Sequence, residues 1–229
     1  MKTIYELKDE LCYLFTQAQL APWMLGINSG DFYDLLPDDN DDKKKNREGL
    51  TDLVYNHPEE WMSDFKFIID GGVEGDEERR GSGRDRKKIG AAILTSGMIH
   101  VCQSQIYDPE SLGRHVGFAK FMNSVKSWSD AAETITLLSN CRFLFVSEVY
   151  IAADTNKTML RTVAESFNDL LERRENHNLV TIVSVKPSMI KRAMAESDFL
   201  GAGMKAVLDQ LGDVGTIIMK DKRLCRIAF

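Results

Sequence analysis

The feature that most constrains the fold is the stretch FLFVSEVYIAADTNKTMLRTVAESFNDLLERRE at residues 143–175. Its first part is an apolar run typical of a buried strand, and a short polar turn, AADTNK, separates that run from a second pattern. In the second pattern the apolar side chains recur at helical spacing and form one broad face. Its members are Met159, Leu160, Val163, Ala164, Phe167, Leu170 and Leu171. The stretch therefore predicts a strand followed by a helix, from Thr158 to Glu175, that packs on the sheet.

The polar turn has two interpretations. The first turn of the helix leaves backbone N–H groups without partners at the positive end of the helix dipole, so an anion could dock above Thr155 to Thr158, helped by Lys157. Alternatively, Asp154 or Thr155 caps the helix with a side-chain oxygen and satisfies the same donors. Every connection from a strand to a helix offers the capping alternative, and both interpretations stay open.

The other segments predict further strands and helices around this unit. Compact apolar runs at 65–72 and 87–97 are typical of two strands of a hairpin. Further strands are expected at 98–109 and 179–185, and one or two more within 214–229. Residues 111–140 have a helical pattern, and Pro187 and Ser188 mark the start of another helix. The sequence therefore predicts an α/β (α+β) fold with a mixed central sheet flanked by helices.

The first part of the chain, residues 1–64, predicts a helical extension of the same domain as 65–229. An amphipathic helix follows the capping-box pattern of Thr3 and Glu6, and residues 34–48 have the composition of a solvated loop. Pro58 divides a later helical stretch into two short helices. Within 65–229, residues 108–140 are expected to form a helical insertion between strands that belong together.

The connection between the two hairpin strands, residues 73–88, is densely charged and contains no aromatic side chain. Such a segment cannot bury apolar surface, so we expect a flexible solvated loop. Its arginines could hold a phosphate or an acidic partner, although neighbouring acidic residues offset their charge. These arginines are Arg79, Arg80, Arg84 and Arg86. The GSG sequence within the connection is by itself too weak to predict a phosphate-binding loop.

Composition narrows the class of protein. The chain has 229 residues, 43% of them hydrophobic, so it is long enough to bury a real core. The formal net charge of -6 disfavours broad nucleic-acid binding. The cysteines are widely spaced and form no CxxC pair, so the sequence indicates neither a zinc site nor a disulfide framework. Because it shows no signal peptide and no long apolar run, we expect a cytoplasmic protein without a membrane segment.

The order of elements from residue 65 onward resembles the GNAT superfamily of N-acetyltransferases. In this comparison FKFIID and IGAAIL are the antiparallel strands, FLFVSEVYIA is the splayed central strand, and ADTNKTML is the pyrophosphate loop. SMIKRAMAESDF resembles the last helix of the family. The resemblance implies a GNAT-like sheet and a site for acetyl-CoA or another acyl-CoA.

The resemblance also implies a set of site residues. The cofactor would lie against the central strand, at Val149 and Ile151, and its pyrophosphate would bind the loop and helix start. The loop residues are Asn156, Lys157, Thr158, Met159 and Leu160. Glu148 is the candidate general base and Tyr150 lies on the same side of the strand by its period of two. Glu148 could instead be an exposed carboxylate or a partner of Arg142, and Tyr150 could be a packing residue.

The resemblance predicts an acyl-CoA-dependent N-acyltransferase that transfers an acetyl or related group to a small-molecule or protein amine. The alternative is a catalytically silent relative that acts through protein contacts, because AADTNKTML lacks the glycines of the family loop. His100 and His115 are further polar candidates, His100 within a strand and His115 in a loop or helix start. The sequence does not set the oligomeric state, and a homodimer stays open.

Overall fold

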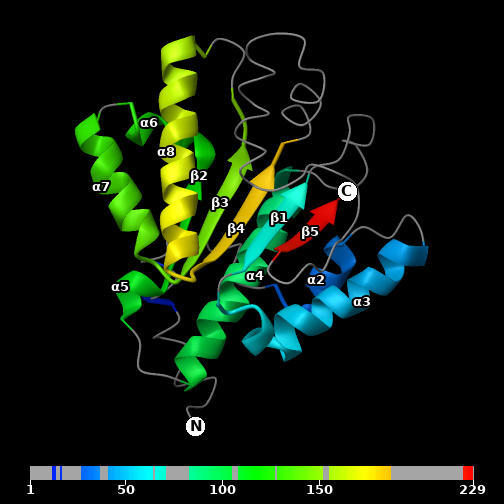
Figure 1. Ribbon diagram of the computed structural model, residues 1–229. Helices are drawn as coiled ribbons and strands as arrows, with labels where there is room; N and C mark the ends of the chain where they lie inside the picture. The colour runs from blue at the N-terminus through cyan, green and yellow to red at the C-terminus, as the bar shows by residue number, and fades with distance from the viewer. Residues whose placement is uncertain are drawn as a thin grey trace.

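A computed structural model describes residues 12, 13, 16, 27–36, 41–63, 65–70, 83–104, 108–126, 128–151, 155–186 and 224–228. Its centre is a five-stranded sheet in the order β2-β3-β4-β1-β5 (Figure 1). The strands are β1 (Lys66–Asp70), β2 (Gly113–Gly117), β3 (Phe143–Val149), β4 (Val180–Val185) and β5 (Leu224–Ala228). Every pairing between these strands is parallel. The α/β class is thus confirmed, whereas the expected mixed sheet is wrong for the described strands.

Helices cover both faces of the sheet, as a parallel sheet requires. They are α2 (Ser29–Leu35), α3 (Asp41–Asn56), α4 (Gly83–Ser104), α5 (Pro109–Leu112), α6 (Phe118–Ser124), α7 (Trp128–Ser139) and α8 (Lys157–Asn176). Figure 1 shows α8 in front of β3 and β4, with α7 beside it, and α4 behind the sheet. Two apolar cores result, one uniting α2, α3 and α4 with the sheet and the other uniting α6, α7 and α8 with it.

Helix α4 replaces two expected strands, so the predictions at 87–97 and 98–109 were wrong. The helix is apolar on nearly all sides because it is buried, and a short run of that kind cannot be distinguished from a buried strand by periodicity. Gly90 and Gly97 let it approach β3 closely. A Cβ atom at Gly90 would lie 2.3 Å from the ring of Phe145, and one at Gly97 would lie 2.7 Å from the ring of Phe143.

Strand β2 was not predicted. Residues 111–140 contain the expected helices α6 and α7, but the five residues GRHVG between α5 and α6 form an edge strand that pairs with β3. This short strand carries too little alternation to be recognised within a helical region. Residues 108–140 therefore supply a strand of the main sheet, which corrects the expectation of a purely helical insertion.

The outcome for the other elements is mixed. The strand at 143–149, the helix that follows it and the strand at 180–185 are confirmed. The break at Pro58 is also confirmed, because α3 ends before the 3-10 turn Pro58–Glu60. Residues 41–48 begin α3, so the solvated loop predicted for 34–48 is wrong there. Likewise, residues 83–88 of the expected charged loop are the first turns of α4.

Several predictions lie outside the described residues. These are most of the first helix, the charged connection up to residue 82, the helix after Pro187 and the chain from 214 to 223. Within the first helix, Cys12, Tyr13 and Thr16 are helical. Helices α2 and α3 share a core with α4 and the sheet through buried residues such as Phe32 and Val54.

Candidate functional site

Polar side chains from three neighbouring strands and one helix meet where the strands end. They are Arg86 of α4, His115 of β2, Ser147 and Glu148 of β3, and Ser184 of β4, and we call them the carboxyl-edge cluster. The sequence of β3 explains its position, since FLFV is buried in the sheet and the polar SE pair follows at the end of the strand. In open parallel sheets, ligands bind outside the carboxyl ends of the strands. The cluster therefore occupies the edge where a binding site is expected.

The first contact in the cluster is an ion pair between Arg86 and Glu148. Arg86 Nε donates to Glu148 Oε1 and Nη2 donates to Oε2, both at 3.2 Å. The side chains are only 6% and 13% exposed, so the pair is largely removed from water. Arg86 lies in the first turn of α4, and the pair therefore ties the start of that helix to the end of β3. Arg142, the partner considered from the sequence, lies before β3, at the opposite end of this strand.

The backbone of Glu148 is in the left-handed region, with φ of 58°. A non-glycine residue adopts this conformation at a cost, and such residues concentrate at functional sites. The pairing of β3 with β4 shifts register between Val146 and Val149, and the Glu148 N–H donates to Ser184 Oγ at 2.8 Å. The simple alternation expected to place Glu148 and Tyr150 on one side of β3 is therefore broken at Glu148.

Ser147 and His115 form the second contact of the cluster. His115 Nε2 lies 2.9 Å from Ser147 Oγ, and its ring packs on that of Phe145 at a centroid distance of 5.1 Å. His115 is thus a strand residue, which corrects the loop or helix start expected for it. Ser147 and Ser184 are 2% and 0% exposed, so both hydroxyls are buried at the edge of the sheet. His100, the other histidine considered, lies on α4 rather than on a strand.

Tyr150, expected beside Glu148, follows the end of β3 and has a packing environment. It contacts the apolar core between the sheet and α8, and the ammonium of Lys186 lies 4.9 Å from the centre of its ring. Val149 and Ile151, expected to line a cofactor, are both fully buried in that core. Among these three residues, the structure thus brings none into the carboxyl-edge cluster.

A side chain of the loop before α8 caps the first turn of that helix. Asn156 is the N-cap and its Oδ1 accepts from the Met159 N–H at 2.8 Å. The capping interpretation holds, but with Asn156 as the cap instead of Asp154 or Thr155. Lys157 is exposed, and Leu160 is 3% exposed and packs into the core.

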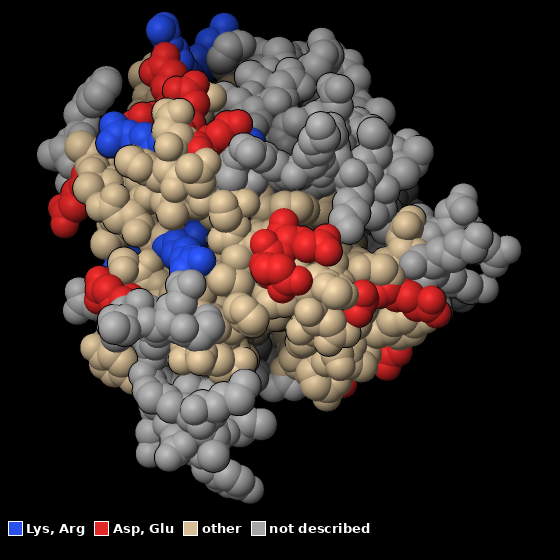
Figure 2. All heavy atoms as spheres, turned by 60° about the horizontal axis from the view of Figure 1, so that its bottom comes forward, with Lys and Arg blue, Asp and Glu red and all other residues tan. Residues whose placement is uncertain are grey.

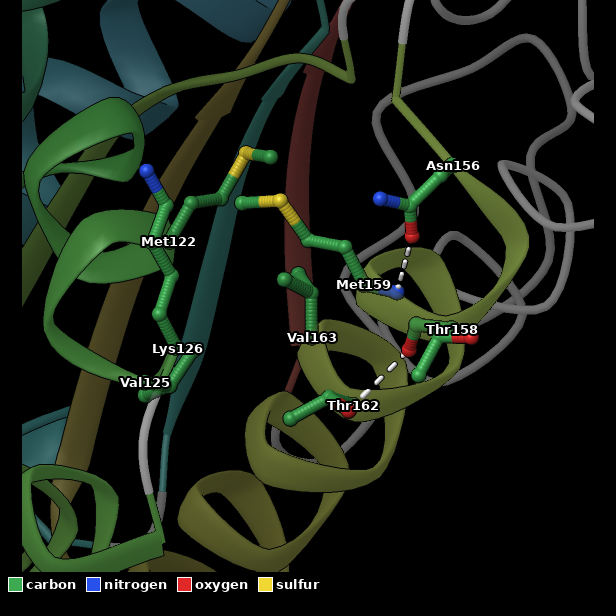
Figure 3. Close-up of a pocket in the computed structure, with 8 residues that line it drawn as sticks. All are labelled: Met122, Val125, Lys126, Asn156, Thr158, Met159, Thr162 and Val163. Carbon is green, nitrogen blue, oxygen red and sulfur yellow. Dashed lines mark hydrogen bonds between the residues drawn. The ribbon is translucent and has the colours of Figure 1, made fainter.

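A pocket of about 210 Å³ lies beside this helix start, between α6 and α8. Figure 3 shows Met122 and Met159 pointing toward one another across it, with Asn156 and Thr158 at the amino end of α8. The remaining lining residues are Val125, Lys126, Thr162 and Val163. Three of the residues expected to bind a cofactor, Asn156, Thr158 and Met159, therefore line a pocket, which shares no lining residue with the carboxyl-edge cluster.

Sequence reasoning missed a buried arginine at the opposite, amino-terminal edge of the sheet. Arg174, in the last turn of α8, is 0% exposed. Its Nη1 donates to the carbonyls of Leu138 and Cys141 at 2.7 and 2.8 Å, and its Nε donates to Thr181 Oγ1 at 2.9 Å. Its Nη2 donates to the Val180 carbonyl. Burial lowers the pKa of Arg174 and raises that of the neighbouring Cys141 thiol.

The described residues were searched for a metal site, a membrane-spanning helix and a continuous basic surface. Among the described residues, no group of three or more His, Cys, Asp or Glu side chains is placed to hold a metal ion. None of the described helices combines the length and apolar character of a membrane span. Figure 2 shows the side at the amino ends of the strands, where the described acidic and basic residues form small separate groups rather than a continuous basic surface.

Comparison with known proteins places the fold. No family model matches the sequence, and no curated protein matches it. Among solved structures, the chain is similar to that described as "Crystal Structure of the DnaI", with a TM-score of 0.52 and 12% sequence identity over 92% of each chain. At this identity the likeness is one of fold.

The resemblance to N-acetyltransferases was wrong, and so was the acyltransferase function based on it. That resemblance required 65–72 and 87–97 to be antiparallel neighbours, whereas the second segment lies in helix α4 of a parallel sheet. The similarity to DnaI points to a different fold. Binding of acyl-CoA has not been tested by any observation and stays a prediction separate from the function proposed below.

Proposed function

We propose that this protein binds a nucleotide through its phosphates at the carboxyl edge of the sheet, as a P-loop protein of the AAA+ type. One observation carries the proposal: the helix that follows β1 begins beside the end of β3, where Arg86 meets Glu148. Helix α4 follows β1 and covers one face, and α8 follows β3 and covers the other. Connections to opposite faces open a crevice at the carboxyl ends of the strands, where nucleotides bind in open α/β sheets.

The sequence before α4 supports a phosphate site. P-loop proteins place a glycine-rich loop between a strand and a helix, and the N–H groups at the start of that helix favour an anion. Here GSG at 81–83 leads directly into α4. Arg84 and Asp85 follow the last glycine, where the usual motif has Lys and then Ser or Thr. Because a guanidinium pairs with phosphate through two parallel hydrogen bonds, an arginine can supply the missing lysine charge.

The fold likeness to DnaI supports the same assignment, because it spans 92% of both chains. Together with the topology, it favours nucleotide binding over the transferase chemistry considered from the sequence. The acyl-CoA site expected from the sequence and the nucleotide site proposed here both lie at the end of β3. The nucleotide site uses the start of α4, whereas the acyl-CoA site used the start of α8.

The residues do not fit the magnesium site of P-loop enzymes. That site uses the Ser or Thr of the loop and an acidic residue. In this chain Asp85 stands where the Ser or Thr is expected, and Glu148 is engaged by Arg86. We therefore propose nucleotide binding, and we assign no hydrolytic step to the cluster.

Thermal unfolding with ATP, ADP and inorganic phosphate tests the proposal. A ligand that binds only the folded state at a hundred times its Kd adds about 2.7 kcal/mol. For a chain of this length, that increment corresponds to a rise in Tm of about 5–10 °C. Arg86→Gln should remove the rise, whereas Arg161→Gln, which removes an exposed arginine of α8, should preserve it. An unchanged Tm with both ATP and ADP, in the wild type and in Glu148→Gln alike, would contradict nucleotide binding.

A further inference from the structure

We propose that the ion pair between Arg86 and Glu148 is a latch that closes the phosphate site until a ligand takes Arg86 away from Glu148. The inference rests on the proposed function, since the ligand is the nucleotide phosphate placed at the start of α4. It adds a form of regulation that nucleotide binding alone does not require.

The geometry of the pair makes such an exchange feasible. Two nitrogens of one guanidinium reach two oxygens of one carboxylate, each at 3.2 Å. A phosphate presents oxygens in the same two-pronged arrangement and competes for the same two donors. While Glu148 holds Arg86, the carboxylate also places a negative charge beside the helix start, where it repels an incoming phosphate. The closed pair therefore opposes binding in two ways.

The backbone of Glu148 offers a second arrangement for the strand. Its φ of 58° and the register shift between Val146 and Val149 interrupt the pairing of β3 with β4. The Glu148 N–H is held outside the regular ladder by Ser184 Oγ at 2.8 Å. If Glu148 returned to extended backbone, the cost of its left-handed conformation would be removed. Loss of the ion pair and relief of the backbone strain are thus linked in one residue.

A static structural ion pair is the alternative, and the two cases differ in what happens when Glu148 loses its charge. A static pair predicts that Glu148→Gln leaves phosphate affinity unchanged or weakens it by disturbing the site. A latch predicts tighter binding, because the apparent Kd is the intrinsic Kd divided by the fraction of open molecules. An open fraction of about 10% corresponds to a gain of about tenfold on removing the latch.

Titration of the full chain with ATP by calorimetry decides between them. We expect Glu148→Gln to bind ATP about tenfold more tightly than the wild type and Arg86→Gln to lose binding. Glu165→Gln is the matched control, because it neutralises the carboxylate of an exposed ion pair with Arg161 and should leave the Kd unchanged. Should Glu148→Gln not fold, Ser184→Ala removes the hydroxyl that holds the Glu148 N–H and should also tighten binding.

The outcomes separate the latch from the proposed function. ATP binding by the wild type with equal or weaker binding by Glu148→Gln, or by Ser184→Ala in its place, overturns the latch and leaves nucleotide binding intact. Binding by Glu148→Gln alone supports both, with the wild type held closed. Absence of binding in the wild type and in the folded latch variant overturns both proposals.

Discussion

Two buried arginines lie at opposite edges of the same sheet, and their partners differ. Arg174, at the amino edge, donates to backbone carbonyls at the end of α7 and the start of β4, and to the Thr181 hydroxyl. Arg86, at the carboxyl edge, donates to the carboxylate of Glu148. Backbone carbonyls cannot leave without unfolding the elements that carry them, whereas a side-chain carboxylate can turn away. Burial of an arginine therefore does not show its role, and the nature of its acceptors does.

The comparison assigns Arg174 to stability and Arg86 to ligand binding. Carbonyls at a helix end lack partners within the helix, and Arg174 satisfies two near the end of α7, those of Leu138 and Cys141. Arg86 lies at the start of a helix, where a positive charge is unfavourable to the dipole and is offset by an anion. That anion is Glu148 in the closed site and a phosphate in the proposed complex.

The largest expected effect is the loss of stability in Arg174→Met. The substitution removes the guanidinium donors from several buried carbonyls, and we expect the free energy of unfolding to fall by about 3–5 kcal/mol. Urea denaturation followed by circular dichroism measures the change. Arg173→Met is the neighbouring control, because Arg173 is exposed and pairs with Asp169 at the surface, so its loss should change little. A small effect of Arg174→Met would remove the distinction between the two edges.

The next largest effect is the loss of stability in Arg86→Met, which a second substitution at Glu148 should reverse. Arg86→Met leaves the Glu148 carboxylate without this partner at a site that is still 13% exposed, and we expect a loss of about 2–3 kcal/mol. Adding Glu148→Met should restore most of it, since replacing a buried ion pair with apolar side chains is often neutral. Urea denaturation of Arg86→Met, Glu148→Met and the double variant gives the coupling free energy between the two side chains. Failure of the double variant to recover would show that Arg86, like Arg174, is held by more than its carboxylate.

The close approach of α4 to β3 positions Arg86 beside Glu148, and Gly90 tests it. A Cβ at Gly90 would overlap the ring of Phe145, so Gly90→Ala should cost about 1–3 kcal/mol by overpacking. Gly49→Ala in α3 meets nothing within 4 Å and should stabilise the protein by about 0.5–1 kcal/mol. Both values come from thermal or urea unfolding. Equal effects of the two substitutions would argue against the close contact of α4 with β3.

The smallest expected effect is on the alkylation of Cys141, which lies beside Arg174 at the amino ends of the strands. Burial raises the pKa of the Cys141 thiol, so Cys141 should remain protonated and resist iodoacetamide at neutral pH. Exposed Cys12 should react readily, and mass spectrometry of the digested protein distinguishes the two sites. Arg174→Met should increase labelling of Cys141 by loosening its surroundings. Rapid labelling of Cys141 in the wild type would show that the amino edge opens easily.

The sequence correctly predicted the elements whose hydrophobic pattern and length favour one kind of secondary structure. The runs FLFVSEV and VTIVSV were identified because each is a short, compact apolar run of strand length, and the helix between them was identified by its clear apolar face. Helix α4 was missed because it is buried on most sides and contains glycines that pack against Phe143 and Phe145. Strand β2 was missed because five residues between helices show no period.

The site was predicted in part. Glu148 was recognised as a polar residue at the end of a buried strand, and Arg86 as an arginine able to hold a phosphate or an acidic group. The pairing of Arg86 with Glu148 was not predicted, because 62 residues separate them in the sequence. The parallel sheet brings the start of α4 to the end of β3. Ser184 acts through the distorted backbone of Glu148, and no sequence pattern announces that distortion.

The most direct test is a crystal structure of the protein with a non-hydrolysable ATP analogue. We predict phosphate oxygens about 3 Å from the guanidinium of Arg86, an open contact between Arg86 and Glu148, and unchanged contacts of Arg174 with its carbonyls. An intact pair of Arg86 and Glu148 in a nucleotide complex, with the phosphates bound elsewhere, would contradict the account.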